Sequence, residues 1–122
     1  MQAFLFVFFG GGLGALCRYG ISRLFVSSNH FPSATFIANV ISCIILGGLI
    51  GLTLKDGLSS SQKLLWMTGF CGGFSTFSTF SGETFNLLQE GQTTTAMVYV
   101  LSSVVVCILC IWLGLFLSQK IF

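Results

Sequence analysis

The sequence predicts an all-α membrane protein, with a single transmembrane domain over residues 1–122 that crosses the bilayer four times. Hydrophobic residues make up 54% of the chain, charged residues 7%, and the mean hydropathy is +0.96. A soluble domain carries about 25% charged residues, so this chain has too little polar surface to face water. A membrane-spanning helix needs roughly 20 predominantly apolar residues. Four segments meet that length: 4–26, 33–54, 63–89 and 94–117.

The first segment, 4–26, is expected to be a retained helix and not a signal peptide. No basic residue precedes its apolar run, and no small-residue cleavage site follows it. Arg18 lies in its second half. Because ionisable groups at membrane depth are costly and usually functional, Arg18 is a candidate site residue.

Pairs of small residues four positions apart occur in the first two segments. Gly10 and Gly14 lie in the first, and Gly47 and Gly51 in the second. Such faces let helix backbones approach closely. They are compatible with a dimer and equally with a tight bundle within one chain.

Polar residues in the second and fourth segments are hydrogen-bonding groups without a carboxylate. Asn39 lies in 33–54, and Tyr99 and Ser103 lie in 94–117, whereas the carboxylate of Glu83 lies toward the end of the third segment. A cation pathway normally needs a carboxylate inside the membrane. Amide and hydroxyl donors are better suited to an anion.

The third segment, 63–89, contains the adjacent glycines Gly72 and Gly73, which weaken helical backbone. We expect the helix to break there, because irregular backbone at membrane depth survives only inside protein or beside water. The alternative is that these glycines only permit close helix packing. Phe77 and Phe80 share one helical face after them, and a phenyl ring has a positive edge that can contact an anion weakly.

The five cysteines are interpreted as small apolar packing residues. Cys107 and Cys110 have the spacing of half a metal motif, but no second such pair exists. We therefore expect neither zinc nor disulfides.

Basic residues are distributed almost evenly between the two sides of the predicted membrane topology. One side holds Lys55, Lys63 and Lys120, and the other Arg23 with Arg18 nearby, which is 3 against 2. Because the Lys/Arg bias sets the orientation in the membrane, a chain with so small a bias can insert in either orientation. The alternative is a single orientation that other factors determine. Two opposite copies would form an antiparallel dimer with the symmetry that larger transporters obtain from inverted repeats.

Several separate motifs resemble those of one known family. The run from Gly69 to Glu83, the GGGLGALCRY segment over 10–19, and Thr35 to Asn39 resemble, in order, motifs of the Fluc (CrcB) fluoride channels. Tyr99 and Ser103 resemble the polar positions of the family's fourth helix. The resemblance covers the whole chain.

The resemblance implies a dual-topology antiparallel homodimer with two fluoride pores. It implies a central structural sodium ion held by the backbone carbonyls of Gly72 and Ser75. Asn39, Phe77 and Phe80 match pore positions of the family. The further matching positions are a polar track at Ser78 and Thr79, and Arg18 and Glu83 near the pore ends.

Four positions depart from the family pattern. Phe74 and Ser75 stand where many relatives have leucine and threonine, although a hydroxyl residue is retained at 75. Ser42 stands where a glycine is expected, and Cys107 lies one turn after Ser103, where a hydroxyl would be the better donor. The carry-over of site residues along the fourth helix is correspondingly weaker.

The expected function is a passive fluoride channel, not an enzyme, in the plasma membrane of a microbe, where it lets cytoplasmic fluoride leave down its gradient. The alternative is a small proton-coupled multidrug exporter of similar size and topology. Such an exporter needs an embedded acid in its first helix, where this chain carries Arg18. A third possibility is a passive membrane scaffold.

Overall fold

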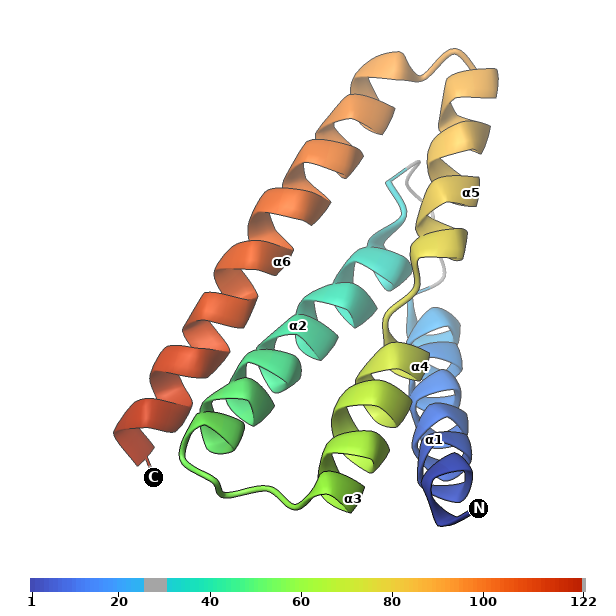
Figure 1. Cartoon of the computed structure of the whole chain (residues 1–122). Coiled ribbons are helices and arrows are strands. Elements are labelled where there is room, and N and C mark those ends of the chain that lie inside the picture. The colour runs from blue at the N-terminus through green and yellow to red at the C-terminus, as the bar shows by residue number, and fades with distance from the viewer. Residues whose placement is uncertain (26–30, 122) are drawn as a thin grey trace.

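The computed structural model describes residues 1–25 and 31–121, and this part of the chain is entirely helical apart from its connections (Figure 1). Three helices are long and apolar enough to cross a membrane: α1 (Gln2–Leu24), α2 (Ser33–Leu54) and α6 (Thr93–Ile121). They correspond to the predicted segments 4–26, 33–54 and 94–117. The predicted end of the first segment at position 26 lies outside the described residues.

The fourth predicted span, 63–89, is a succession of shorter elements. It comprises α3 (Ser60–Lys63), the π-helix η1 (Leu64–Cys71), α4 (Gly72–Phe74) and α5 (Phe77–Gln89). The first three run on continuously, and a short extended stretch then separates α4 from α5. In Figure 1 the N-terminus, the α2–α3 connection and the C-terminus lie at one end of the bundle. The α5–α6 turn lies at the other end.

The helix break does not fall at Gly72-Gly73, as predicted, but at Ser75 and Thr76. Gly72 is helical, with φ −64° and ψ −35°, whereas Ser75 has ψ 159° and Thr76 has φ −152° and ψ 123°. The prediction failed because hydroxyl and amide side chains, not glycine flexibility, end the helix. The Ser75 hydroxyl donates a hydrogen bond to the carbonyl of Cys71 at 2.8 Å. The Thr76 side chain caps α5 by accepting a hydrogen bond from the Thr79 N–H at 3.2 Å.

The small-residue faces pack within the chain. The α1 helix lies against η1 and α4, and α2 lies against α6. A Cβ added at Gly10 would collide with the Leu65 carbonyl, and one at Gly47 with the Ile111 carbonyl. Gly73 likewise faces the Gly11 carbonyl. Of the two roles left open for the glycine pairs, the structure therefore shows the intrachain one.

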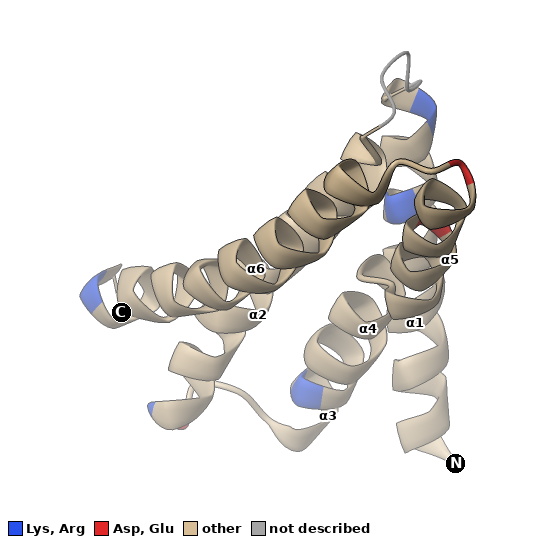
Figure 2. Cartoon of the chain, turned by 90° about the horizontal axis from the view of Figure 1, so that it is seen from above, with Lys and Arg blue, Asp and Glu red and all other residues tan. Residues whose placement is uncertain are grey.

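Little of the described chain is buried, and the largest fully buried side chain is Tyr99. It belongs to a small core with Leu87 and Ala96, against which Phe31, Phe36 and Phe80 pack. Large apolar side chains along α1 and α6 face outward instead. Charged residues gather mainly at the helix ends and connections (Figure 2). This distribution fits helices surrounded by lipid.

Candidate anion pathway

The helix break is held by Asn39 of α2. Its side-chain oxygen accepts a hydrogen bond from the Thr76 N–H at 2.8 Å, and its Nδ2 donates to the Thr76 carbonyl at 3.4 Å. One amide side chain thus satisfies both backbone groups of Thr76, the residue directly before α5. Because an unpaired backbone group inside a membrane costs several kcal/mol, this pairing makes the break tolerable.

The first turn of α5 offers donors. The first N–H groups of a helix have no carbonyl acceptor within that helix, because no helical turn precedes them. The helix macrodipole also places positive potential at this end. The Thr76 side chain satisfies only the Thr79 amide. The amides of Phe77 and Ser78 therefore remain suitable for an anion.

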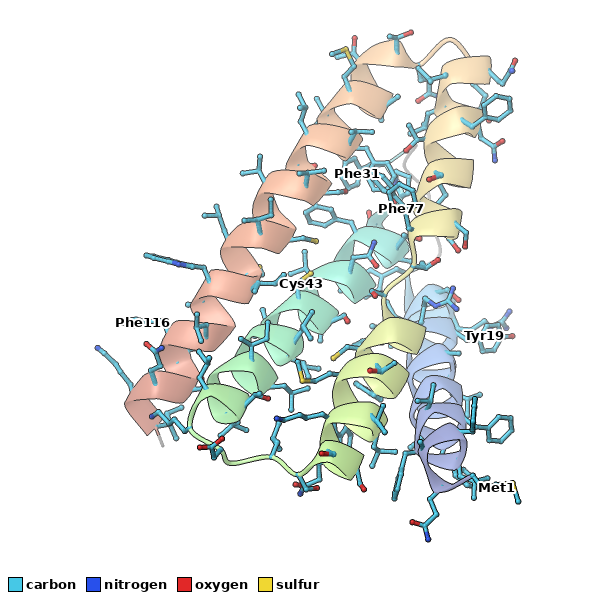
Figure 3. All side chains as sticks on the ribbon, viewed as in Figure 1. Met1, Tyr19, Phe31, Cys43, Phe77 and Phe116 are labelled. Atoms are coloured by element: carbon cyan, nitrogen blue, oxygen red, sulfur yellow. The ribbon has the colours of Figure 1, made fainter. Side chains whose placement is uncertain are left out.

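A cavity of about 250 Å³ opens beside this turn. Its lining carries amide, hydroxyl, thiol and phenyl groups but no charged side chain, and consists of Asn39, Cys43, Ser75, Thr76, Phe77, Phe80, Ser103, Val104 and Cys107. In Figure 3, Cys43 lies on the side of α2 toward α6, and Phe77 lies at the start of α5. The cavity is formed by α2, the break, α5 and α6.

Ser103 is the unsatisfied polar group of this cavity. It is 6% exposed, and among the described residues its Oγ has no hydrogen-bond partner. A buried hydroxyl without a partner costs about 1–3 kcal/mol, so its presence needs a reason. An anion in the cavity would supply the missing acceptor.

The phenyl rings connect the cavity to the partly buried carboxylate of Glu83. The centroids of Phe77 and Phe80 are 5.7 Å apart, and those of Phe80 and Tyr99 are 5.0 Å apart. The Tyr99 hydroxyl donates to Glu83 Oε2 at 2.7 Å, and the Thr35 hydroxyl donates to Glu83 Oε1 at 2.7 Å. Each carboxylate oxygen of Glu83 therefore has a donor, which explains how it is accommodated there.

A second cavity, of about 300 Å³, lies on the other side of Glu83. It is lined by α1, α2 and α5 through Ala15, Arg18, Tyr19, Ser22, Ala34, Thr35, Thr79 and Glu83. Arg18 reaches across from α1 and donates from Nε to the Gly73 carbonyl at 3.2 Å. This places a positive charge beside the C-terminal end of α4, where carbonyls are left without helical partners.

The predicted site residues thus fall into two groups joined by Tyr99. Asn39, Phe77, Phe80 and Ser103 line the first cavity, and Arg18, Thr79 and Glu83 line the second. Ser78 lines neither; its hydroxyl lies 3.3 Å from that of Thr76.

Sequence reasoning did not select four residues that the structure brings to these cavities. Thr35 and Thr76 bond Glu83 and Asn39, respectively, and Cys43 and Cys107 line the first cavity. The spacing of Thr35 and Cys43, each four residues from Asn39, was the signal available for two of them.

The fold and this break define a class: a small multi-pass membrane protein with a donor-lined cavity beside an interrupted helix. Residues 5–115 match the family model described as CrcB-like protein, Camphor Resistance (CrcB). The chain belongs to this family, and it is a multi-pass membrane protein of a microbe.

Relatives match along nearly the entire chain, and their names are those of channels, not of enzymes. A "Fluoride-specific ion channel FluC" of Pyrococcus abyssi is 44% identical over 121 residues, covering 98% of each chain. The protein of the same name from Geotalea daltonii is 41% identical, covering 99% of this chain and 100% of its own. That of Flavobacterium psychrophilum is 34% identical, with 99% and 100% covered.

Proposed function

We propose that this protein is a fluoride-selective passive ion channel that lets cytoplasmic fluoride leave the cell through its plasma membrane. The observation that carries the proposal is the first cavity, which has donors and phenyl rings but no charged side chain. Relatives named as fluoride-specific channels support it. The N–H and O–H groups would replace part of the hydration shell of a small anion. The contacts with the ring edges are weak, so the anion could still dissociate from the cavity.

Within this proposal, fluoride passes between the two cavities along the Phe77, Phe80 and Tyr99 rings. The free Ser103 hydroxyl and the first amides of α5 bind it on one side. Thr79 and Arg18 attract it on the other. The donors on Glu83 spread its negative charge, which lowers its repulsion of a passing anion.

We also propose that the channel is an antiparallel homodimer of dual topology. The start of α5 is open at the surface of a single chain: Phe77 is 80% exposed, and Ser78 and Thr79 are also exposed. If the Phe77 ring lines a pore, another protein surface must cover its exposed side. A copy in the opposite orientation would supply it, and the weak basic bias is compatible with both orientations.

A structural sodium ion at the dimer axis fits the backbone at the break. The Thr76 amide bonds Asn39 instead of the Gly72 carbonyl, and the Thr79 amide bonds Thr76 instead of the Ser75 carbonyl. Both carbonyls therefore lack helical donors, and Gly72 is exposed on the single chain. Carbonyl oxygens are suitable ligands for a hard cation. Gly72 and Ser75 would hold it, and its role there would be structural.

The decisive experiment is fluoride efflux from vesicles reconstituted with the purified full-length protein. With a fluoride-selective electrode and no proton gradient, we expect efflux that follows the fluoride gradient, and no comparable chloride efflux in matched vesicles. Transport of a cationic drug only under a proton gradient would support the exporter instead. If neither fluoride nor the drug moved, the proposal would be overturned, and a passive membrane scaffold would be the remaining hypothesis.

A further inference from the structure

Two cysteines from different helices meet in the wall of the first cavity. Cys43 of α2 and Cys107 of α6 both line it, and both are partly exposed. Both therefore belong to the lining of one cavity between the packed helices α2 and α6. They are separated by 64 positions in sequence, since 107 − 43 = 64, so only the packing of α2 on α6 brings them together.

The surroundings favour a soft metal ion over a hard one. The cavity lining has no carboxylate or imidazole, and within the described residues no cluster of three or more such ligands forms. Two thiols alone suit soft, thiophilic cations of low coordination number, such as Cu⁺, Ag⁺ or Hg²⁺. A hard cation such as Mg²⁺ or Ca²⁺ prefers oxygen ligands, so a pair of thiols does not select it.

From this geometry we infer that Cys43 and Cys107 form a two-thiol site for a soft metal ion within the cavity. When Hg²⁺ binds, each thiol loses its proton to water and each sulfur forms one bond to the metal, giving a neutral S–Hg–S bridge between α2 and α6. No oxidant or reductant is involved. The bridge occupies the cavity beside Asn39, Phe80 and Ser103.

The inference has a functional consequence that rests on the proposed channel activity. A metal ion seated between α2 and α6 takes up part of the 250 Å³ through which fluoride is proposed to pass. It also couples two helices that line the route. Soft metals would therefore inhibit fluoride flux, and excess small-molecule thiol would reverse the inhibition by competing for the metal.

Binding can be measured without any transport. In a Cys17→Ser, Cys110→Ser background, native mass spectrometry with HgCl2 should show one tightly bound mercury per chain. Cys43→Ser or Cys107→Ser in that background should weaken binding at least tenfold. The thiolate-to-mercury absorption in the near ultraviolet should fall in parallel. Equal mercury affinity in either single variant would overturn the paired site.

Flux provides the second readout, and Cys17 the matched control, because it is exposed on α1 and lines neither cavity. Relative to the same protein without mercury, micromolar HgCl2 should reduce fluoride efflux at least fivefold in the wild type and in Cys17→Ser. In Cys43→Ala and Cys107→Ser, whatever efflux each variant shows untreated should be unaffected by HgCl2. Inhibition that persists in both of the latter variants would refute a block at this pair. If the untreated protein conducts no fluoride, the proposed function fails, while the mercury stoichiometry still decides whether the site exists.

Discussion

At the scale of single residues, the candidate pathway is set by which polar groups are already paired. Three of these side chains form hydrogen bonds with other protein groups: Asn39, Thr35 and Tyr99. The Ser103 hydroxyl has no hydrogen-bond partner among the described residues. This difference separates a residue that shapes the pathway from one that can bind the ion. It makes distinct predictions for the two kinds of substitution.

Ser103→Ala should lower fluoride flux several-fold without destabilising the protein. The hydroxyl is buried without a partner, so its removal costs no hydrogen bond within the protein and relieves an unpaired polar group, which is expected to raise the free energy of unfolding by up to about 1–3 kcal/mol. Flux and thermal unfolding in detergent, measured on the same preparation, check both parts. Undiminished flux would remove Ser103 from the pathway.

Asn39→Asp should reduce both flux and stability. One carboxylate oxygen can still accept from the Thr76 N–H, but the other would face the Thr76 carbonyl, where Asn39 now donates. Losing that donor and adding negative charge beside the cavity is expected to cost about 1–3 kcal/mol and to repel the anion. Unchanged fluoride efflux in vesicles would contradict a pore position for Asn39.

Phe80→Ile should suppress flux without unfolding the protein. The ring lies between Phe77 and Tyr99, and isoleucine keeps apolar bulk but lacks a positive edge. The loss in stability should stay within about 1–3 kcal/mol, as measured by thermal unfolding. Wild-type efflux in this variant would count against the proposed ring contacts.

At the scale of secondary-structure elements, glycines bring helix backbones together and hydroxyl residues interrupt one of them. Ser42 illustrates the second role: it is 2% exposed and donates to the Cys71 carbonyl at 3.1 Å, the same carbonyl that Ser75 bonds. The serine at this position, where the family resemblance led us to expect glycine, therefore secures the end of η1. The order of the helices was predictable from hydropathy alone, but the position of the break was not.

Gly10→Ala and Gly12→Ala form a matched pair that tests the close packing. A Cβ at Gly10 would meet the Leu65 backbone carbonyl, whereas one at Gly12 would meet nothing within 4 Å. We expect Gly10→Ala to destabilise the protein by at least about 1–3 kcal/mol and Gly12→Ala to be neutral or slightly stabilising. Thermal unfolding of the two variants checks this, and equal midpoints would show that α1 and η1 do not touch there.

At the scale of the whole molecule, a single chain leaves its candidate pathway open on one side. Phe77, Ser78 and Thr79 are exposed at the start of α5, and much of α1 and α6 is apolar and outward-facing. Lipid suits the outer apolar faces but not the hydroxyls at membrane depth. An oppositely oriented copy would cover those hydroxyls, which is the structural reason for proposing the antiparallel dimer.

Dual topology predicts that a thiol at Ser61 is labelled from both sides of the membrane. Ser61 is exposed in α3, at the end of the bundle that carries the N- and C-termini. In a background without native cysteines, a membrane-impermeant maleimide added outside intact cells should label about half of Ser61→Cys. Labelling of nearly all or nearly none would indicate one orientation and would rule out the antiparallel dimer.

The sequence by itself determined three membrane-spanning helices, the absence of carboxylates from them, and the residue types of the candidate site. These follow from composition and from the cost of polar groups in lipid, which act wherever the chain folds. Tertiary structure alone decided where the third predicted span breaks, which backbones the glycines touch, and that Cys43 and Cys107 line one cavity. Those outcomes depend on partners from distant helices, such as Asn39 for Thr76, because a backbone group turns from its own helix only when another element offers it a better hydrogen bond.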